Sequence, residues 1–483
     1  METYGIDFGT TNTGLAAYDR GVIRTFGHDG QRPLSSVVAI HGLTGQVNAV
    51  GCDAWEREES LREHCQIITS VKSWLGDETK HWPAGPRTWT PEHIATEILK
   101  TLRERFERGQ NERLTEAVFS VPVGCSASRR QALRRAAKAA GIHIKSFIPE
   151  PTAAVLKNFK AVSKSPKVAV FDWGGGTLDV SVVEIQRHHV RELGTFGVRL
   201  GGDDLDHKLA LHVHEEIARQ HGLDVPFEAM EPTARDVLKA RVEAAKRRLS
   251  STDSEEVRMA SYGHLIGISY TLTALKLRTL LQPEYENAWR ALEETVLRKA
   301  HTSFAEIGCV LMVGGSSKLR GLVEFIEDKS GRPIERPPDA DWNIAQGASM
   351  VSATPGAHVI ARGFGLAVSD GSYFPLLRAG EPVNHTAIHQ HFGLVEDTDE
   401  ARFVFVEPHR HDVAEGDDFG YDTLDYMNVP AYGFSDESIM LSTRVTEDLV
   451  VEVEGRSWHR ENEAPVKLQF EKLHLRYLLP DNK

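Results

Sequence analysis

The residues best suited to chemistry lie in two short stretches that share one layout. The first is "YGIDFGTTNTG", which begins at Tyr4, and the second is "VFDWGGGTLDV" at residues 170–180. Each has an apolar run, an aspartate, and then a turn of glycine and threonine. Such a turn presents backbone N–H groups and hydroxyls with few Cβ atoms in the way, so it suits an anion such as phosphate.

The aspartates of these stretches, Asp7 and Asp172, indicate a metal ion as well. A carboxylate repels a phosphate, but the two can share a site when Mg²⁺ with its water shell stands between them. One such turn alone would be an ordinary β-hairpin. Two of them in one chain predict a clamp that holds a polyphosphate and a metal from both sides.

Hydrophobic periodicity predicts the elements that would position these turns. Residues 4–8 and 15–18 are the strands of one predicted hairpin, and residues 167–173 and 178–185 are those of the second. Further predicted elements are a strand at 35–40, helices at 61–75, 91–109, 126–141 and 234–251, and a strand, turn and helix over 309–328. The repetition indicates two halves of similar design that face each other.

The bulk composition limits the class of protein. A chain of 483 residues is too long for one hydrophobic core, so about two to four domains are expected. The net charge of −13 argues against nucleic acid as a main partner, because phosphate binding requires clustered Lys and Arg. No apolar run reaches the length of a membrane span, and a strand begins almost at once, so neither a membrane segment nor a signal peptide is expected.

The scattered cysteines favour reduced thiols and a cytoplasmic protein, because they lack both CxxC spacing and the density of a secreted scaffold. They are Cys52, Cys65, Cys125 and Cys309. After residues 353–358 the composition changes to short runs in which apolar and polar residues alternate, separated by turn residues. This period of two is typical of an antiparallel β-domain.

Longer motifs carry a resemblance to a known family. They are "GIDFGTTNTGLAAY", "SVKSWLG", "SVPVGCSASRRQALRRAAKAAG", "PEPTAAVL", "VFDWGGGTLDVSVVEI", "RLGGDDLDHKL", "EAAKRRLSS" and "VLMVGGSSKLRGL", which span residues 4 to about 350 in family order. In these motifs the sequence resembles the 70-kDa heat-shock chaperone family of the DnaK type, within the actin-like ATPase superfamily. The expected member is short, divergent and of the bacterial type, without the helical lid, because the last predicted strand ends close to Lys483.

The resemblance implies an α/β fold with a two-lobed actin-like ATPase domain, which is a duplicated ribonuclease-H-like fold, followed by a small antiparallel β-sandwich domain. The nucleotide-binding domain is expected at 1–355, with lobe I over about 1–165, lobe II over about 166–335 and a returning helix to 355. The sandwich, which resembles the family's peptide-binding domain, is expected at 356–483.

The resemblance also implies roles for individual residues. The residues with an expected catalytic role are Lys72, Glu150, Asp172 and Thr177. Lys72 matches the lysine that positions the attacking water and touches the γ-phosphate. The residues expected in or beside the phosphate loops are Asp7, Gly9, Thr10, Thr11, Asn12, Gly174, Gly175, Gly176, Gly201 and Gly202. Asp7 and Asp172 would hold Mg²⁺ through water, and Asp179 would bind a monovalent cation such as K⁺.

A further group of residues is expected to hold the nucleoside. Glu243, Lys246, Arg247 and Ser250 are spaced by three and four residues, so they share one face of a helix. Alone, this face would be solvated surface; in the resemblance it grips ribose and adenine. The residues that would close the other side are Gly314, Gly315, Ser316, Lys318 and Asp341. The family usually has arginine in place of Lys318, so adenine stacking is expected to be weaker.

These features predict a slow Mg²⁺-dependent ATPase of the chaperone type that uses ATP and ADP. Its nucleotide state is expected to control the binding of an extended or unfolded peptide, or of a dedicated protein partner. Two alternatives stay open: a nucleotide-gated scaffold or exchange factor with little hydrolysis, and a small-molecule kinase of the same superfamily.

A generic J-domain cochaperone is not an expected partner. Ser146 and Pro149 replace the arginine and asparagine that the family usually carries where it receives J-domains. Serine cannot replace the bidentate ion pair that an arginine makes with a carboxylate.

Overall fold

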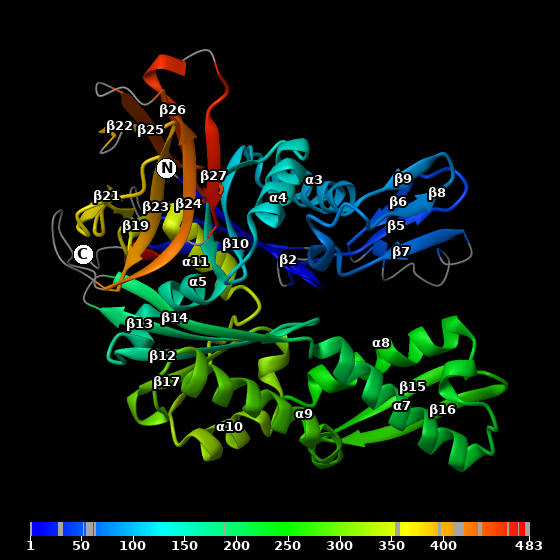
Figure 1. The fold of residues 1–483 in the computed structure, drawn as a ribbon. Coiled ribbons are helices and arrows are strands. Elements are labelled where there is room, and N and C mark those ends of the chain that lie inside the picture. The colour runs from blue at the N-terminus through cyan, green and yellow to red at the C-terminus, as the bar shows by residue number, and fades with distance from the viewer. Residues whose placement is uncertain are drawn as a thin grey trace.

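The computed structural model contains two α/β lobes and a β-sandwich (Figure 1). It describes residues 2–27, 32–51, 53–54, 61, 64–186, 189–352, 358–394, 398–409, 420–432, 437–460, 463–471 and 473–478. Lobe I, in blue and cyan, and lobe II, in green, lie one above the other, and the sandwich, in yellow to red, lies beside lobe I near helix α4 (Ala127–Ala139).

Lobe I is built on a mixed sheet with the strand order β11-β10-β1-β2-β3, in which β4 also pairs with β2. The strands are β1 (Thr3–Phe8), β2 (Asn12–Asp19), β3 (Val22–Phe26), β4 (Leu34–Ser35), β10 (Glu116–Val121) and β11 (His143–Pro149). A small sheet, β6-β5-β7, and a hairpin, β8-β9, form its outer part. Their bounds are β5 (Val38–His41), β6 (Val47–Val50), β7 (Cys65–Ile68), β8 (Trp82–Ala84) and β9 (Arg87–Trp89), and the turn η1 (Val71–Trp74) follows β7.

Helix α3 (Pro91–Gln110) illustrates how local sequence sets an element of lobe I. Pro91 occupies the first helical position, and the Thr90 hydroxyl accepts a hydrogen bond from His93 N, which satisfies one of the free N–H groups of the first turn. Buried apolar residues follow at intervals of three and four, so one face packs into the lobe I core.

Lobe II is built on a sheet with the order β18-β17-β12-β13-β14-β28-β19. Its strands include β12 (Lys167–Trp173), β13 (Leu178–Gln186), β14 (His189–Val198), β17 (Cys309–Val313) and β18 (Ile334–Glu335). Its helices and turns are α7 (Gly202–His221), η2 (Phe227–Ala229), α8 (Pro232–Arg248), α9 (Ala274–Glu294), η3 (Thr295–Lys299), η4 (Phe304–Glu306), η5 (Gly315–Lys318) and α10 (Leu322–Ser330). The hairpin of β15 (Ser254–Tyr262) and β16 (Leu265–Thr273) lies beyond α8.

Both faces of the lobe II sheet are buried, which explains the continuous apolar run of β12. Ala169, Phe171 and Trp173 point into the core of lobe II. Val168 and Val170 point the other way, into a core shared with α5 (Glu150–Lys157) and α11 (Asn343–Ser352). The short helix α6 (Phe159–Val162) follows α5 and also contributes to this second core.

Helix α11 returns the chain to lobe I and packs closely on β1 and α5. A Cβ on Gly5 would lie 2.1 Å from the Ser349 nitrogen, and a Cβ on Gly347 would lie 1.9 Å from the Ala153 oxygen. Glycine at both positions therefore allows this backbone contact.

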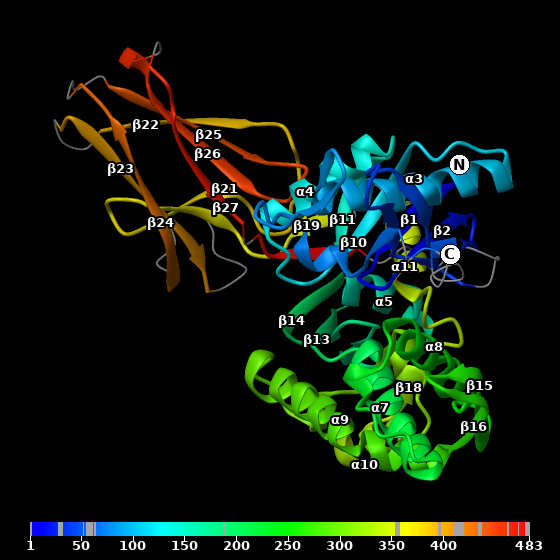
Figure 2. The ribbon, with the colours of Figure 1, turned by 90° about the vertical axis from the view of Figure 1, so that its right-hand side faces the viewer.

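The sandwich has two four-stranded sheets, with the orders β21-β20-β23-β24 and β22-β25-β26-β27. The bounds are β20 (Phe364–Ala367), β21 (Tyr373–Leu377), β22 (Ile388–Gly393), β23 (Glu400–Pro408), β24 (Tyr421–Pro430), β25 (Ser438–Val445), β26 (Val451–Ser457), η6 (Trp458–Arg460) and β27 (Val466–Phe470). Phe364, Phe405 and Phe470 pack on one another between the sheets, with ring centroids 4.9–5.7 Å apart. Figure 2 shows the sandwich extending away from the two lobes on one side.

Two strands that flank the sandwich pair outside it. They are β19 (His358–Ile360), which precedes it, and β28 (Leu475–Leu478), which follows it. Strand β28 pairs with β14 of lobe II, and β19 pairs with β28. The sequence pattern does not indicate this pairing, because four residues of alternating character do not specify their partner strand.

The predicted fold is confirmed, and so are both hairpins and the helices at 91–109, 126–141 and 234–251. Two expectations need correction. The strand expected at 35–40 is present from Val38 as β5, because Ser35 pairs with β2 as part of β4 and the Ser36 N–H donates to the Thr11 oxygen. Within the helix expected at 61–75, residues 65–68 form strand β7, because they pair with β5, and residues 71–74 form the turn η1; residues 62 and 63 lie outside the described residues. The domain boundaries at 355 and 356 stay a prediction.

Among the described residues, no helix combines the length and apolarity needed to cross a bilayer. Cys65, Cys125 and Cys309 are free thiols. Cys52 lies outside the described residues.

Candidate functional site

The two glycine hairpins have the same hydrogen-bond geometry. Gly9 N donates to the Asn12 oxygen, and Gly174 N donates to the Thr177 oxygen, each over 2.9 Å. The two turns also meet, because a Cβ on Gly175 would lie only 2.2 Å from the Thr11 hydroxyl oxygen. Glycine at this position therefore permits the contact between the lobes.

Two other elements support the second turn. At the start of α7, Gly202 N donates to the Gly174 oxygen over 3.0 Å, and Asp203 N donates to the Gly175 oxygen over 2.8 Å. From η5, the Ser316 hydroxyl donates to the Gly174 oxygen over 2.9 Å. The turn is thus bound to the N-terminus of a 20-residue helix, whose positive dipole end favours an anion nearby.

A pair of oppositely charged groups lies in lobe I, beside the first turn. The Lys72 ammonium, on η1, donates to a Glu150 carboxylate oxygen over 2.6 Å, and both side chains are largely buried. Glu150 is the first residue of α5. On β1, Asp7 accepts a hydrogen bond of 2.7 Å from the Ser120 hydroxyl on β10. The structure therefore brings together residues that lie far apart in the sequence.

The carboxylates of this site are hard to ionise together. Burial raises the pKa of Asp7 to about 6, although Lys72 opposes the shift. Burial and the nearby carboxylates of Glu150 and Asp179 raise the pKa of Asp172 well above its ordinary value. Burial and Glu150 raise the pKa of Asp179 to about 6. For Lys72, burial acts to lower the pKa, but the Glu150 and Asp7 carboxylates raise it above its ordinary value.

The residues present fit a hydrated divalent cation. Asp172 and Asp179 lie directly opposite each other on β12 and β13, an arrangement that repels unless a cation relieves it. The Thr11 hydroxyl oxygen is buried beside the second turn and has no hydrogen-bond partner within the described chain. In the described residues no group of three or more His, Cys, Asp or Glu side chains is arranged to ligate a metal directly. The fit is therefore to an ion that keeps its water shell.

Part of the predicted nucleoside face lies next to the second turn. The Lys246 ammonium on α8 donates to Asp206 over 2.8 Å and to the Gly202 oxygen over 3.2 Å, which joins α8 to the start of α7. The Ser250 hydroxyl donates to the Arg247 oxygen over 2.6 Å.

The remaining predicted nucleoside residues form two exposed ion pairs. Glu243 and Arg247 of α8 pair over 2.8 Å, and both side chains are partly exposed. Lys318 pairs with Asp341 over 2.5 Å, and both side chains are about 40% exposed. A Cβ on Gly315 would lie 2.9 Å from Asp341, and Gly314 has a φ of 81°, which favours glycine. The structure therefore brings Lys318 and Asp341 together beside the predicted glycine turn.

Thr10 of the first turn also lies close to Gly176 of the second turn. A Cβ on Gly176 would lie 3.0 Å from the Thr10 methyl group. A Cβ on Gly201 would lie 2.0 Å from the Gly175 oxygen. The Thr177 hydroxyl donates to Asp179 over 2.8 Å. All phosphate-loop residues predicted from the sequence thus lie on or directly beside the two turns.

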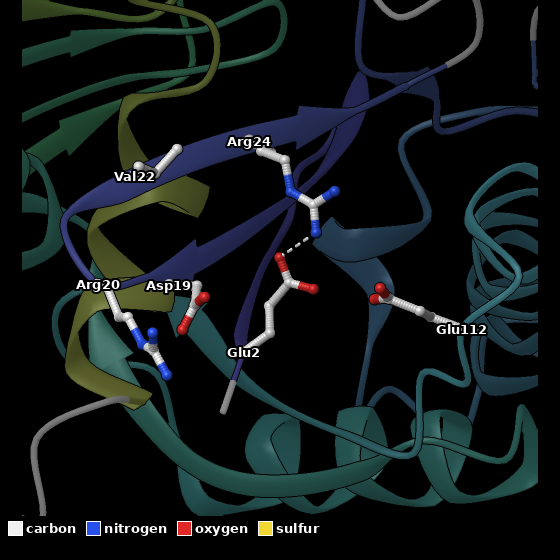
Figure 3. Close-up of a pocket in the computed structure, with 6 residues that line it drawn as sticks. All are labelled: Glu2, Asp19, Arg20, Val22, Arg24 and Glu112. Carbon is white, nitrogen blue, oxygen red and sulfur yellow. Dashed lines mark hydrogen bonds and ion pairs between the residues drawn. The ribbon is translucent and has the colours of Figure 1, made fainter.

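Two open hollows lie away from this site. One, of about 560 Å³, is lined by Glu2, Asp19, Arg20, Val22, Arg24 and Glu112 on the outer edge of lobe I. Figure 3 shows Arg24 reaching across it to pair with Glu2. The other, of about 480 Å³, lies where α4 approaches Glu447 of the sandwich. Neither hollow includes a residue of the two turns, and the mixed charges of the first do not favour a phosphate.

Sequence reasoning missed several residues that support the site. Ser120 is a buried serine within the otherwise apolar strand β10. A polar residue at a buried strand position was the sequence signal that could have indicated its role. Asp206, the buried partner of Lys246, lies within the motif "RLGGDDLDHKL" but was assigned no role there; burial raises its pKa to about 7. The Thr152 hydroxyl, two residues after Glu150, donates to Glu192 on β14 over 2.6 Å. This bond links the helix that bears Glu150 to lobe II.

We expect Glu192 to make the stability of the protein depend on pH. Burial raises its pKa from 4.5 to about 7, although the bond from Thr152 opposes the shift. A carboxyl whose pKa is raised by folding stabilises the protein below its unfolded pKa, and this contribution is lost as the pH rises through the folded pKa. We expect Glu192→Gln, which can still accept the Thr152 bond, to be no more stable than the wild type at pH 4.5 and clearly more stable at pH 8.

Thermal unfolding midpoints measured from pH 4.5 to pH 8 check this expectation. The matched control is Glu324→Gln, which changes an exposed glutamate on α10 and should leave the curve unchanged. A Glu192→Gln curve that runs parallel to the wild-type curve over the whole range would contradict the assignment.

The fold and site together define a class of protein. Two lobes whose glycine hairpins meet beside a lysine and several carboxylates, followed by a β-sandwich, are an actin-like ATPase fold with an attached β-domain. A comparison with protein families agrees: the model of the Hsp70 protein family matches residues 81–358, which is more than half of the chain. The chain belongs to the Hsp70 family, whose members are nucleotide-binding chaperones with ATPase activity. This confirms the resemblance predicted from the motifs.

Proposed function

We propose that this chain binds ATP with Mg²⁺ between the two hairpin turns and hydrolyses the ATP slowly. The observation that carries the proposal is the meeting of the two equivalent glycine turns beside the buried Lys72–Glu150 pair. Phosphoryl transfer requires positioning and neutralisation of charge more than covalent chemistry by the protein. The turns supply aligned N–H groups, and Lys72 supplies a positive charge close to them.

In this mechanism each polar group has a distinct task. Lys72, held in place by Glu150, donates to the γ-phosphate and orients the attacking water. Asp7 and Asp172 would hold the hydrated metal, and Asp179, which accepts a hydrogen bond from the Thr177 hydroxyl, would hold a monovalent cation. When bound, Mg²⁺ supplies neutralisation of the phosphate charge.

The nucleoside would lie between α8 and η5. Lys246 and Ser250 would contact the ribose from α8, while the Gly314–Gly315 turn would approach the base. Lys318 is held by Asp341, so its ammonium has to leave this ion pair before it can stack on adenine. This supports the expectation that adenine binding is weaker than with an arginine.

We also propose that nucleotide state controls the position of the sandwich. Arg134 of α4 pairs with Asp448 over 2.8 Å, and Arg130 donates to the Asp448 backbone oxygen over 2.6 Å. Leu449 packs against the core of lobe I. Arg130 lies in the motif that begins at Ser120, and its contact with Asp448 supports a role in relaying signals between the domains.

The sandwich would use this coupling to bind and release an extended peptide or a dedicated partner. Its two stacked sheets and its contact with lobe I support a binding role in the manner of the family. Generic J-domain proteins are still expected to have little effect, because Ser146 and Pro149 on β11 lack the arginine and amide side chains of the family.

A phosphate-release assay tests the proposal. We expect Mg²⁺-dependent turnover below about 1 s⁻¹, the low end of the usual enzymatic range, and faster turnover with a suitable extended peptide. Chelation of Mg²⁺ should stop turnover, and a generic J-domain protein should change it little. Binding of ATP with no turnover under any of these conditions would instead indicate the nucleotide-gated scaffold, and release of phosphate only with a small-molecule acceptor would indicate the kinase.

A further inference from the structure

Strand β28 joins lobe II to the segment that leads into the sandwich. On one side it pairs with β14, where Val190 is the partner of Tyr477. On the other side it pairs with β19, where His358 is also a partner of Tyr477. The sandwich is therefore inserted between two neighbouring antiparallel strands of the lobe II sheet.

Hydrogen bonds continue from β19 into the sandwich domain. Ile360 N donates to the Glu381 oxygen over 2.9 Å, and Val383 N donates to the His358 oxygen over 2.9 Å. On the β28 side, Ala361 N donates to the His474 oxygen over 2.8 Å. The lobe II sheet thus ends at β19, and hydrogen bonds with an isolated bridge between Val359 and Pro382 connect β19 to the loop that follows β21 of the sandwich.

Tyr477 anchors β28 in the ATPase core. It is only 4% exposed and belongs to the apolar cluster that contains Val190 and the shared core of the two lobes. Its ring packs edge-on against the ring of His358 at 5.1 Å. His358 in turn donates from Nε2 to the Phe147 oxygen on β11 of lobe I over 2.9 Å. Both lobes, β19 and β28 therefore meet at one tyrosine.

We propose that β28, together with the contact between α4 and Asp448, holds the sandwich on the ATPase lobes, and that β28 separates from β14 when the sandwich moves away. A linker of one strand would leave the sandwich free to swing about β19. Here the chain returns to the same sheet edge, so movement must break the pairing of β28 and withdraw Tyr477 from the core. This inference goes beyond the proposed function and does not depend on ATP hydrolysis.

The position of β28 also connects it to helix α5, which bears Glu150. Val190 and Glu192 lie on the same face of β14, because side chains alternate along a strand. Glu192 accepts the hydrogen bond from Thr152 on α5, and burial together with the nearby charge of Glu192 raises the pKa of Tyr477. Separation of β28 would therefore change the surroundings of a residue that is bonded to the helix bearing Glu150.

Hydrogen exchange without nucleotide tests the proposal on the full chain. In Tyr477→Ala we expect exchange at residues 189–190 and 358–360 to rise by at least about tenfold, while β25 and β26 keep their protection. Small-angle scattering should show a larger radius of gyration. The matched control is Tyr426→Ala, which removes an exposed tyrosine of the sandwich and should change neither measurement. Unchanged exchange at 358–360 in Tyr477→Ala would overturn the proposal.

A reversible disulfide crosslink between β14 and β28 tests the proposal even if Tyr477→Ala fails to fold. His189 and Leu478 are directly paired on β14 and β28, so cysteines at both positions lie within disulfide reach. The crosslink is made by His189→Cys and Leu478→Cys in a chain whose four natural cysteines are replaced by alanine. In mild urea the reduced protein should expand before its lobes unfold, and the oxidised protein should not. Equal expansion of both forms would show that β28 does not hold the sandwich.

Discussion

Lys72→Ala is expected to reduce ATP turnover by at least about 100-fold, the loss typical of removing a group that stabilises transition-state charge. The Lys72 ammonium is hydrogen-bonded to Glu150, and the change to alanine adds no atoms near the two turns. Nucleotide should therefore still bind through the turn amides and the metal. In the proposed mechanism, the attacking water would then lose its orienting donor. Single-turnover hydrolysis and nucleotide titration, measured on the same preparation, separate the two effects.

The loss of Lys72 also leaves Glu150 without its buried partner, and breaking a buried pair typically costs about 3–5 kcal/mol. Thermal unfolding therefore has to accompany the assay. Lys80→Ala is the matched control, because Lys80 lies on a nearby surface over the Trp74 and Trp82 rings. Turnover of Lys72→Ala at the wild-type rate would show that the lysine has no catalytic role.

Gly201→Ala is expected to weaken nucleotide binding by about 100-fold, which corresponds to about 2.7 kcal/mol. A Cβ on Gly201 would lie 2.0 Å from the Gly175 oxygen and 2.5 Å from the Gly176 carbonyl carbon. Both contacts are with backbone, so no side chain can move aside. The second turn must shift away from the start of α7, and its N–H groups lose their alignment toward the phosphates.

Gly109→Ala is the control for this experiment. Gly109 lies near the end of α3, and a Cβ there would have no heavy atom within 4 Å. Alanine is favoured over glycine in a helix by up to about 1 kcal/mol, so this variant should bind nucleotide normally and unfold at the same or a higher temperature. If calorimetry gives Gly201→Ala the affinity of the wild type, the contact between Gly201 and the second turn does not shape the site.

The candidate site could be predicted because its main parts are local motifs. Each hairpin needs an apolar strand, an acid and a glycine turn in direct succession, and the structure shows the same hydrogen bond, from Gly9 to Asn12 and from Gly174 to Thr177, in both. Ser120 and Asp206 lie within the quoted motifs, but the motifs did not show that they contact Asp7 and Lys246. Each supports the site from another strand or another turn of a helix, and a single sequence does not show which side chains meet across elements.

The wrong secondary structure predicted at residues 61–75 also arises because a single sequence does not show which elements meet. The pattern at 61–75 is compatible with a helix, but residues 65–68 form a strand because β5 offers an edge for pairing. In contrast, α3 and α4 were predicted correctly because their signals are local. Thr90 with Pro91 begins the first helix, Ser126 caps the second, and Gly141, with a φ of 80°, ends it.

The amino-acid sequence by itself thus determined the two glycine turns, the helices with strong caps, the alternating strands of the sandwich and the family. These features depend on residues within about one element of each other, where spacing alone carries the information. Only the tertiary structure decided which carboxylates gather around Lys72, how α4 contacts Asp448, and that β28 lies between β14 and β19. The physical reason is that burial, charge coupling and strand pairing depend on groups brought together by the whole fold. A four-residue strand such as β28 does not specify its partner edge from its own sequence, whereas in the folded chain it pairs with β14 and β19 and Tyr477 is buried.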